Sequence, residues 1–221
     1  MKKLALLHTV VWLPQVFQGL CSELMPEVET YHVVDESLLR EAIRVGNLTP
    51  RVYRAVARYA VSAQEGGADA VLVTCSSISP CVDVAQKLVG IPILKIDEAM
   101  ADKAVRIGRK IGVVATLSST LNPTSALVRE RARLLGKEVE VRPTLCEGAF
   151  EAASAGNMAT HDTVVREALR HLAEQVDVIV LAQASMARVA DQLDEKEKTI
   201  PILSSPRLGV MRARGVLEGR Q

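Results

Sequence analysis

The stretch "AVLVTCSSIS", Ala70 to Ser79, is a run of β-forming residues that ends at a single cysteine followed by two serines. A second stretch, "VIVLAQASMA" from Val178 to Ala187, repeats this pattern about 108 residues later. Short apolar runs of this kind are typical of fully buried parallel strands. The first copy carries Cys75 where the second carries Gln183. The strand pattern is therefore repeated, but the reactive side chain at its end is not.

Strand-like and helical runs alternate on both sides of these stretches. In the first half we expect strands at 2–9, 29–36, 69–77 and 92–97, and helices at 50–67 and 81–89. In the second half we expect a strand and turn at 109–120, strands at 138–148, 177–185 and 201–206, and a helix at 161–176. "IPILKID" in the first half and "IPILSSP" in the second support the duplication. The last stretch, 206–221, is predicted to form a helix that returns to the first half.

This alternation predicts an α/β fold with parallel sheets and right-handed crossovers. We expect two pseudo-symmetric lobes, each a four-stranded parallel sheet of order 2-1-3-4 flanked by helices. Lobe one comprises 1–97 and 207–221, and lobe two comprises 98–206. In such sheets ligands bind at the carboxyl ends of the strands where the chain direction reverses. If the lobes face each other, their strand tips meet in one active-site cleft.

Composition excludes several classes of protein. The net charge of +1 gives no electrostatic reason to expect a nucleic-acid partner. No apolar run reaches the roughly 18 residues of a membrane span. The start "MKKLALLHTVVWLP" is charged and apolar like a signal peptide, but His8 interrupts it, so we predict a first buried strand. The four cysteines have no metal or redox spacing, which favours a cytoplasmic protein with reduced thiols.

Cys75 is the strongest candidate for chemistry. It ends a predicted strand where a helix begins, and a helix amino terminus favours the reactive thiolate. The alternative is a small buried hydrophobic residue, which is what we expect of Cys21, Cys81 and Cys146.

The remaining candidates lie at the predicted strand tips. Ser76 and Ser77 could bind an anion with their hydroxyls and backbone N–H groups, or merely cap the helix. His8 could tune the pKa of Cys75 or relay a proton, although a lone histidine is more often structural. The residues that we expect to bind a substrate at these tips are His8, Thr9, Thr74, Ser76, Ser77, Thr116, Ser119, Thr120, Ala184 and Ser185. No glycine-rich phosphate loop is present, so no nucleotide cofactor is expected.

With these motifs the sequence resembles the aspartate/glutamate/hydantoin racemase superfamily over nearly its whole length. The resemblance is most specific at "VLVTCSS", "GVVATLSST" and "VIVLAQASM". It implies two α/β lobes, no cofactor, a small carboxylate substrate and, by analogy, a homodimer. Members of the family place one cysteine from each lobe on either side of a substrate carbon, so that one thiolate takes a proton and the opposite thiol returns one.

The resemblance makes Cys75 the first catalytic cysteine and places Gln183 at the second, in a segment similar to the family's "LGCAGM". "TLSST" is similar to the carboxylate-binding turn, which implicates Thr116, Ser119 and Thr120. The asparagine-bearing turn after strand one is replaced by "HTVVWLP". Because a glutamine amide is neither an acid nor a base near pH 7, ordinary two-cysteine racemisation lacks its second proton carrier.

Three hypotheses therefore stay open. The first is a cofactor-independent isomerase, racemase or decarboxylase of a small carboxylate that uses Cys75, with Gln183 as a hydrogen-bond donor. In the superfamily, arylmalonate decarboxylase keeps only the second cysteine, whereas maleate isomerase uses the first as a nucleophile but also keeps the second, which this chain lacks. The second is a non-catalytic protein that binds a small carboxylate. The third is a thiol hydrolase, which requires contact between Cys75 and His8.

Overall fold

The computed structural model describes residues 1–194 and 196–220. The chain divides into two compact units: unit one comprises Met1–Asp97 and Pro206–Gln221, and unit two comprises Glu98–Ser205. Within the described residues, no helix combines the length and the apolar character that crossing a membrane requires.

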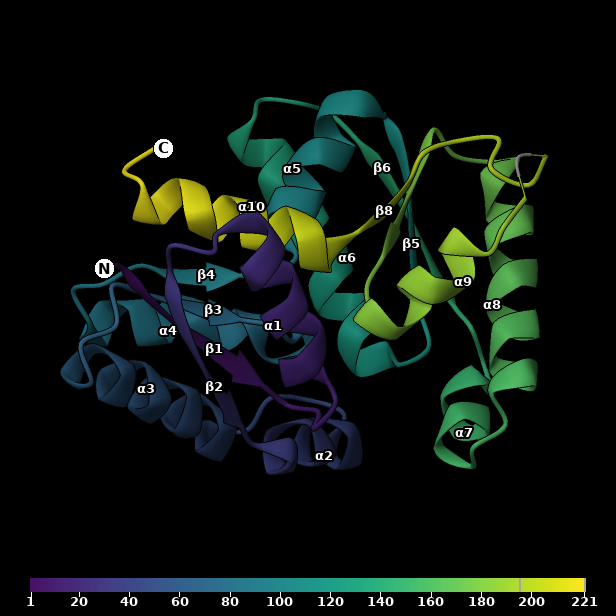
Figure 1. Cartoon of the computed structure of the whole chain (residues 1–221). Helices are drawn as coiled ribbons and strands as arrows, with labels where there is room; N and C mark the ends of the chain where they lie inside the picture. The colour runs from purple at the N-terminus through teal and green to yellow at the C-terminus, as the bar shows by residue number, and fades with distance from the viewer. Residues whose placement is uncertain (195, 221) are drawn as a thin grey trace. The chain divides into compact units, whose positions relative to one another are not determined.

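Unit one contains the first four strands and the last helix (Figure 1). Its elements are β1 (Lys3–His8), α1 (Leu13–Leu24), β2 (Glu29–Val34), α2 (Glu36–Val45), α3 (Pro50–Glu65), β3 (Ala70–Val73), the 3₁₀ helix η1 (Ser76–Cys81), α4 (Val82–Ala85), the 3₁₀ helix η2 (Gln86–Leu88), β4 (Ile93–Lys95) and α10 (Ser205–Leu217). The strands form a parallel sheet of order β2-β1-β3-β4, which confirms the predicted order.

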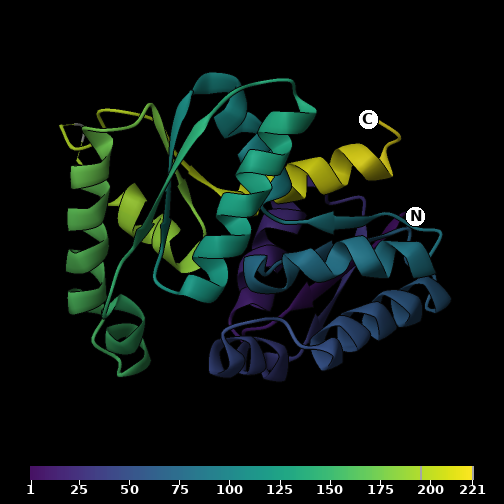
Figure 2. The same ribbon diagram turned by 180° about the vertical axis from the view of Figure 1, so that it is seen from behind.

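The alternation of side chains along the strands builds the core of unit one. Ala5 and Leu7 of β1 point to the face covered by α3, η1 and α4, together with Val71 and Val73 of β3. Figure 2 shows α3 from behind, running across that face. The opposite face is covered by α1, whose Phe17 packs against the ring of His8 with 5.5 Å between the ring centroids.

The helix α10 joins unit one because its sequence permits close packing. A Cβ atom on Gly209 would lie 2.4 Å from the Cδ1 atom of Ile96, so only glycine allows the helix to approach the end of β4. The Arg207 side chain of α10 also forms two hydrogen bonds with the Glu23 carboxylate of α1, at 3.0 and 2.6 Å. The predicted return of the chain end to the first half is therefore supported by specific contacts.

Unit two repeats the architecture. Its elements are α5 (Glu98–Ile107), β5 (Lys110–Ala115), α6 (Ser118–Leu134), β6 (Glu140–Leu145), α7 (Ala149–Ser154), α8 (Met158–Ala173), β7 (Val178–Leu181), the 3₁₀ helix η3 (Ala184–Met186), α9 (Ala187–Asp191) and β8 (Ile202–Ser204). The sheet order is β6-β5-β7-β8, the same 2-1-3-4 order as in unit one. Gly112 on β5 lets α8 pack closely, since a Cβ there would lie 2.5 Å from Leu172.

The two copies share one contact at the amino-terminal edge of their sheets. In unit one the Asp69 carboxylate accepts a hydrogen bond from the backbone N–H of Lys3 at 2.8 Å. In unit two the Asp177 carboxylate accepts from the N–H groups of Arg109 and Lys110, both at 2.8 Å. Each aspartate precedes its central strand and anchors the start of the first strand, so the duplication is retained in detail at this edge.

Several local predictions were wrong. The helix predicted at 81–89 is instead a succession of η1, α4 and η2 that begins at Ser76, because Pro80 lacks the N–H that a regular α-helix would need. The turn predicted through Thr120 is shorter, since α6 begins at Ser118. The helix predicted at 161–176 begins at Met158, where the Asn157 side chain accepts a hydrogen bond from the Thr160 N–H at 3.2 Å.

Candidate active site

Cys75 lies at the carboxyl end of β3, immediately before η1. The residue is partly exposed, whereas Cys21, Cys81 and Cys146 are buried, as their sequence context predicted. Four groups lie near enough to the sulfur to favour the thiolate: the Thr9 hydroxyl, the Ser77 hydroxyl and the backbone N–H groups of Ser77 and Ile78, the last of which also donates to the Cys75 carbonyl oxygen at 3.2 Å. These four groups form a polar cradle around the Cys75 thiol.

Burial outweighs these donors in the resting protein. Loss of hydration raises the pKa of the Cys75 thiol above its ordinary value, although the four hydrogen bonds act in the opposite direction. The amino terminus of η1 favours the thiolate, as the sequence predicted, through the backbone N–H groups of Ser77 and Ile78, but burial has the larger effect and favours the neutral thiol.

The Thr9 hydroxyl is the donor contributed by the neighbouring strand. Thr9 follows directly after β1, and its residue is 1% exposed. Its oxygen makes no hydrogen bond of good geometry among the described residues, to sulfur or to any other atom, yet it lies near enough to the sulfur to lower the pKa of Cys75. We conclude that the Cys75 sulfur, once ionised, is the natural partner of this hydroxyl.

His8 does not form the predicted pair with Cys75. Its Nδ1 lies 2.7 Å from the Thr74 hydroxyl and its Nε2 lies 2.8 Å from the Nδ1 of His32, so both ring nitrogens are engaged. His8 is also completely buried, which removes it from any substrate-facing surface. Burial, reinforced by the neighbouring His32, lowers the pKa of His8 to about 3. The thiol hydrolase hypothesis loses the contact that it required.

Asp97 is a residue of this region that the sequence analysis missed. The side chain is completely buried at the end of β4, and burial raises the pKa of its carboxyl. The Ser79 hydroxyl lies 3.3 Å from its Oδ1 and 3.4 Å from the Cys75 carbonyl oxygen. Asp97 and the buried serines therefore brace the loop that carries Cys75. A lone acid after a strand gives no sequence signal for this role; only its position beside β3 reveals it.

The equivalent tip of unit two is organised around Gln183. The Gln183 Oε1 accepts hydrogen bonds from the Thr116 N–H at 2.6 Å and from the Thr116 hydroxyl at 3.0 Å. These two bonds fix the orientation of the amide, because only its oxygen can accept. Residues 1–194 and 196–220 offer the Nε2 group no hydrogen-bond partner, which leaves two N–H donors available at a partly exposed side chain.

The other predicted binding residues of unit two are less uniform. Ala184 and Ser185 lie in η3 and are partly exposed beside Gln183. Ser119 and Thr120 belong to the first turn of α6, and the Ser119 hydroxyl is buried without a hydrogen-bond partner among the described residues. The segment predicted as a free polar turn is thus largely the start of a helix.

Two further histidines have structural contacts. His161 is 2% exposed and pairs with the adjacent Asp162 carboxylate at 2.9 Å. His32 lies on the edge strand β2 and is the partner of His8. The described residues contain no group of three or more His, Cys, Asp or Glu side chains that could hold a metal ion.

A family model described as Asp/Glu/Hydantoin racemase matches residues 12–213. The chain belongs to this family. Its fold also matches glutamate racemase from Bacillus anthracis with a TM-score of 0.75 at 17% identity, over 99% of this chain and 82% of that chain. Allantoin racemase from Klebsiella pneumoniae matches with a TM-score of 0.72 at 20% identity, over 100% and 89% of the two chains.

A third match is an aspartate racemase from Picrophilus torridus, with a TM-score of 0.71 at 14% identity over 97% of this chain and 95% of that chain. No curated protein sequence matches. For this member of the Asp/Glu/hydantoin racemase family, the comparisons confirm the predicted superfamily and the predicted two-sheet fold. Within this chain, the strand tip of unit one carries the Cys75 thiol, and the equivalent strand tip of unit two carries the oriented Gln183 amide.

Proposed function

We propose that this chain is a cofactor-independent enzyme of the isomerase type that acts on a small carboxylate, with Cys75 as its one reactive thiol. The observation that carries the proposal is the cradle around Cys75, in which Thr9, Ser77 and Ile78 all offer donors to the sulfur. A buried structural cysteine has no need of such donors, as Cys21 illustrates: burial raises its pKa and no hydrogen bond opposes the shift. The cradle is what a thiol that gains and loses a proton requires.

The proposed chemistry proceeds from a neutral thiol. In a decarboxylation, the bond broken to carbon dioxide leaves its electron pair on the substrate carbon. In an isomerisation, Cys75 first loses its proton to solvent, and the thiolate then removes a proton from the substrate, which leaves the electron pair of that bond on an enolate. In both, the Cys75 thiol then gives its proton to the substrate carbon, and the sulfur becomes a thiolate. The donors of the cradle stabilise the new charge without moving, which is the preorganisation that lowers a barrier. In the reverse direction the thiolate removes the proton again.

Gln183 has the second role. With its Oε1 held by Thr116, the amide offers its N–H groups to a carboxylate or enolate oxygen of the substrate. It cannot carry a proton between substrate and solvent near pH 7. Proton transfer is therefore one-sided, which separates this chain from a racemase with a thiol on each side of the substrate.

A decarboxylase of the arylmalonate type is the second candidate, and the neutral resting state of Cys75 favours it. Loss of carbon dioxide leaves a carbanion that needs one proton on one face, which a single thiol can supply. Isomerisation and decarboxylation thus share the same acid and the same hydrogen-bond donor. They differ in the substrate and in whether carbon dioxide is released.

Deuterium incorporation from heavy water tests the proposal even while the identity of the product is unknown. A panel of amino acids, hydantoins, malonates and maleate is incubated with the protein and analysed by mass spectrometry, and carbon dioxide release is recorded in parallel. We expect deuterium at one carbon of at least one acid, and the same acid should protect Cys75 from iodoacetamide. An acid that protects Cys75 but is never converted would instead identify a binding protein.

A further inference from the structure

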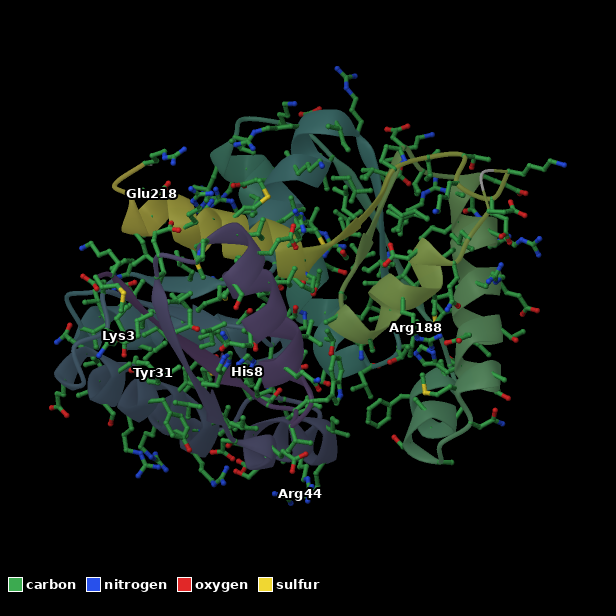
Figure 3. All side chains as sticks on the ribbon, viewed as in Figure 1. Lys3, His8, Tyr31, Arg44, Arg188 and Glu218 are labelled. Atoms are coloured by element: carbon green, nitrogen blue, oxygen red, sulfur yellow. The ribbon has the colours of Figure 1, made fainter. Side chains whose placement is uncertain are left out.

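A ladder of hydrogen-bonded polar side chains, buried at its inner end by His8 and Thr74 and exposed at its outer end, crosses one face of the sheet in unit one. His32 of β2 bonds to His8 of β1 at 2.8 Å, and His8 bonds to Thr74, directly after β3, at 2.7 Å. The outer end of the ladder is Gln18 of α1, whose Oε1 lies 3.2 Å from the Nε2 of His32. Figure 3 labels His8 on β1, on the face that α1 covers through Phe17.

The hydrogen bonds of the ladder have one consistent direction. The Oε1 of Gln18 can only accept, so His32 donates from Nε2 and accepts at Nδ1 from the Nε2 of His8. The Nδ1 of His8 then accepts from the Thr74 hydroxyl. The Leu7 carbonyl, also 3.0 Å from that hydroxyl, already accepts from the Thr74 backbone N–H. Both imidazoles are neutral in this arrangement, and burial, the main cause of the lowered pKa of each, favours that state.

The ladder lies one residue before the cradle on each strand. Pairing in the register Leu7 with Val73 brings His8 beside Thr74, and the next step along both strands brings Thr9 beside Cys75. Because side chains alternate between faces, His8 and Thr74 point to the α1 side. Cys75 points to the opposite side, where it packs against the core cluster under α3. The hydrogen bond between His8 and Thr74 therefore sets the distance between the next two residues, Thr9 and Cys75.

We propose that His8, held by His32, is a positioning residue for Cys75, and that its bond to Thr74 places the Thr9 hydroxyl against the sulfur. The inference rests on the reactive role of Cys75 given above, and it assigns to His8 a task that involves no contact with substrate. The bond from Nδ1 to Thr74 is the one that matters for the thiol. The bond from Nε2 to His32 holds the ring.

Two substitutions of His8 separate these bonds. In His8→Asn the amide lies near the position of Nδ1 and can still bond to Thr74, whereas in His8→Gln it reaches toward His32. Both variants replace an imidazole by a neutral amide, so they have similar costs of burial. The readout is the rate at which iodoacetamide alkylates Cys75 as a function of pH, followed by mass spectrometry of the peptide that contains Cys75.

We expect His8→Asn to keep the pH profile of the native protein within about 0.3 of a pH unit, and His8→Gln to shift it up by about one unit, a tenfold loss of rate at fixed pH. Thr74→Val, which nearly preserves shape, should give the same upward shift, and Thr74→Ser should restore the native profile. These two variants test the hydrogen bond between His8 and Thr74 even if an amide at position 8 prevents folding. His161→Asn, at a buried histidine of unit two, is the matched control and should leave the profile unchanged.

Equal shifts in His8→Asn and His8→Gln, or no shift in Thr74→Val, would overturn the positioning role. The positioning role would also be overturned if, across all variants, the shift of the alkylation pH profile were proportional to the loss of unfolding free energy. Such a result would indicate a general effect on folding. The alkylation assay does not depend on turnover. If Cys75→Ala retained turnover, the proposed function would fail while the result on His8 would stand.

Discussion

The two units have the same sheet order. Their sheets make the same contact at the amino-terminal edge but carry different side chains at the carboxyl edge. At the amino-terminal edge, Asp69 and Asp177 make the same contact with the start of the first strand. At the carboxyl edge, unit one has a thiol surrounded by donors and unit two has an amide whose oxygen is already bound by Thr116. The contact at the amino-terminal edge is the same in both copies, whereas the carboxyl edge, for which we propose chemistry, has diverged. The asymmetry lies in the side chains, since both backbones end their strands in the same way.

Of the substitutions that test this difference between the two units, removal of the Cys75 thiol is expected to have the largest effect on turnover. Cys75→Ala deletes the only proposed proton carrier, so turnover in the deuterium assay should fall by about 10²–10⁴-fold. The unfolding free energy should change little, because the residue is partly exposed. Turnover by Cys75→Ala within tenfold of the native rate would show that the two tips do not differ in the way proposed.

Cys21→Ala provides the matched control for this experiment. Cys21 is buried in α1 and makes no side-chain hydrogen bond among the described residues. This variant should lose stability through the small cavity that it creates. It should keep native turnover per folded molecule, so a loss specific to Cys75 reports chemistry rather than packing.

The second largest effect is expected in unit two from Gln183→Glu. The carboxylate retains an oxygen that can accept from Thr116, but it has no N–H to donate and it repels an anionic substrate. We expect kcat/KM to fall by about 10²-fold, the typical loss when one preorganised donor is removed. Gln192→Glu, at an exposed position of the same unit, should leave kcat/KM unchanged. Equal effects of the two substitutions would mean that the tip of unit two plays no part.

The buried imidazole of His8 predicts how unit one responds to acid. An unfolded imidazole titrates near pH 6.5, whereas the pKa of His8 in the fold is about 3. Between these values the unfolded chain takes up a proton that the folded chain does not, so stability falls as the pH falls, by up to about 1.4 kcal/mol per pH unit. Above pH 6.5 this contribution is constant. Urea unfolding from pH 7 to 4 measures it.

His8→Leu should give a shallower loss of stability below pH 6.5 than the native protein, whatever its stability at pH 7. Only the slope is diagnostic, since Leu removes one hydrogen-bond partner from each of Thr74 and His32 and so lowers stability at every pH. A slope identical to that of the native protein would show that His8 is not held neutral by the fold.

The sequence predicted the architecture because it depends on patterns that repeat. Alternating apolar runs gave both sheets and their strand order, and the two copies of "IPIL" fixed the fourth strand of each. The prediction was poorer where a side chain's environment depends on packing. Cys75 was located correctly at a strand end, but the balance at its thiol could not be predicted, since burial and the amino terminus of η1 act in opposite directions and only the packing shows which is larger. His8 and His32 are far apart in the sequence, and nothing local indicates that they meet.

Substitution of Asp97 is expected to have the smallest effect on the reactivity of Cys75. It tests whether an acid present only in unit one contributes to the difference between the two units. Alignment of "IPILKID" with "IPILSSP" pairs Asp97 with Pro206, so the second copy has no acid at this point. Burial raises the pKa of the carboxyl, and its Oδ2 finds no partner among the described residues, so the side chain is expected to be neutral. Asn has nearly the same shape as a protonated Asp and can accept from Ser79 in the same way.

Asp97→Asn should therefore change the alkylation rate of Cys75 by less than about twofold, because no charge is removed and the brace to Ser79 at 3.3 Å is kept. If Asp97 were ionised, its negative charge would oppose the thiolate, and the substitution would lower the pKa of Cys75 and speed alkylation near pH 7. Asp97→Ala removes the acceptor of Ser79 and should loosen the loop through the Cys75 carbonyl, which the same hydroxyl reaches at 3.4 Å. Faster alkylation in the Asn variant would mean that a fixed negative charge, and not burial alone, keeps the thiol of unit one neutral.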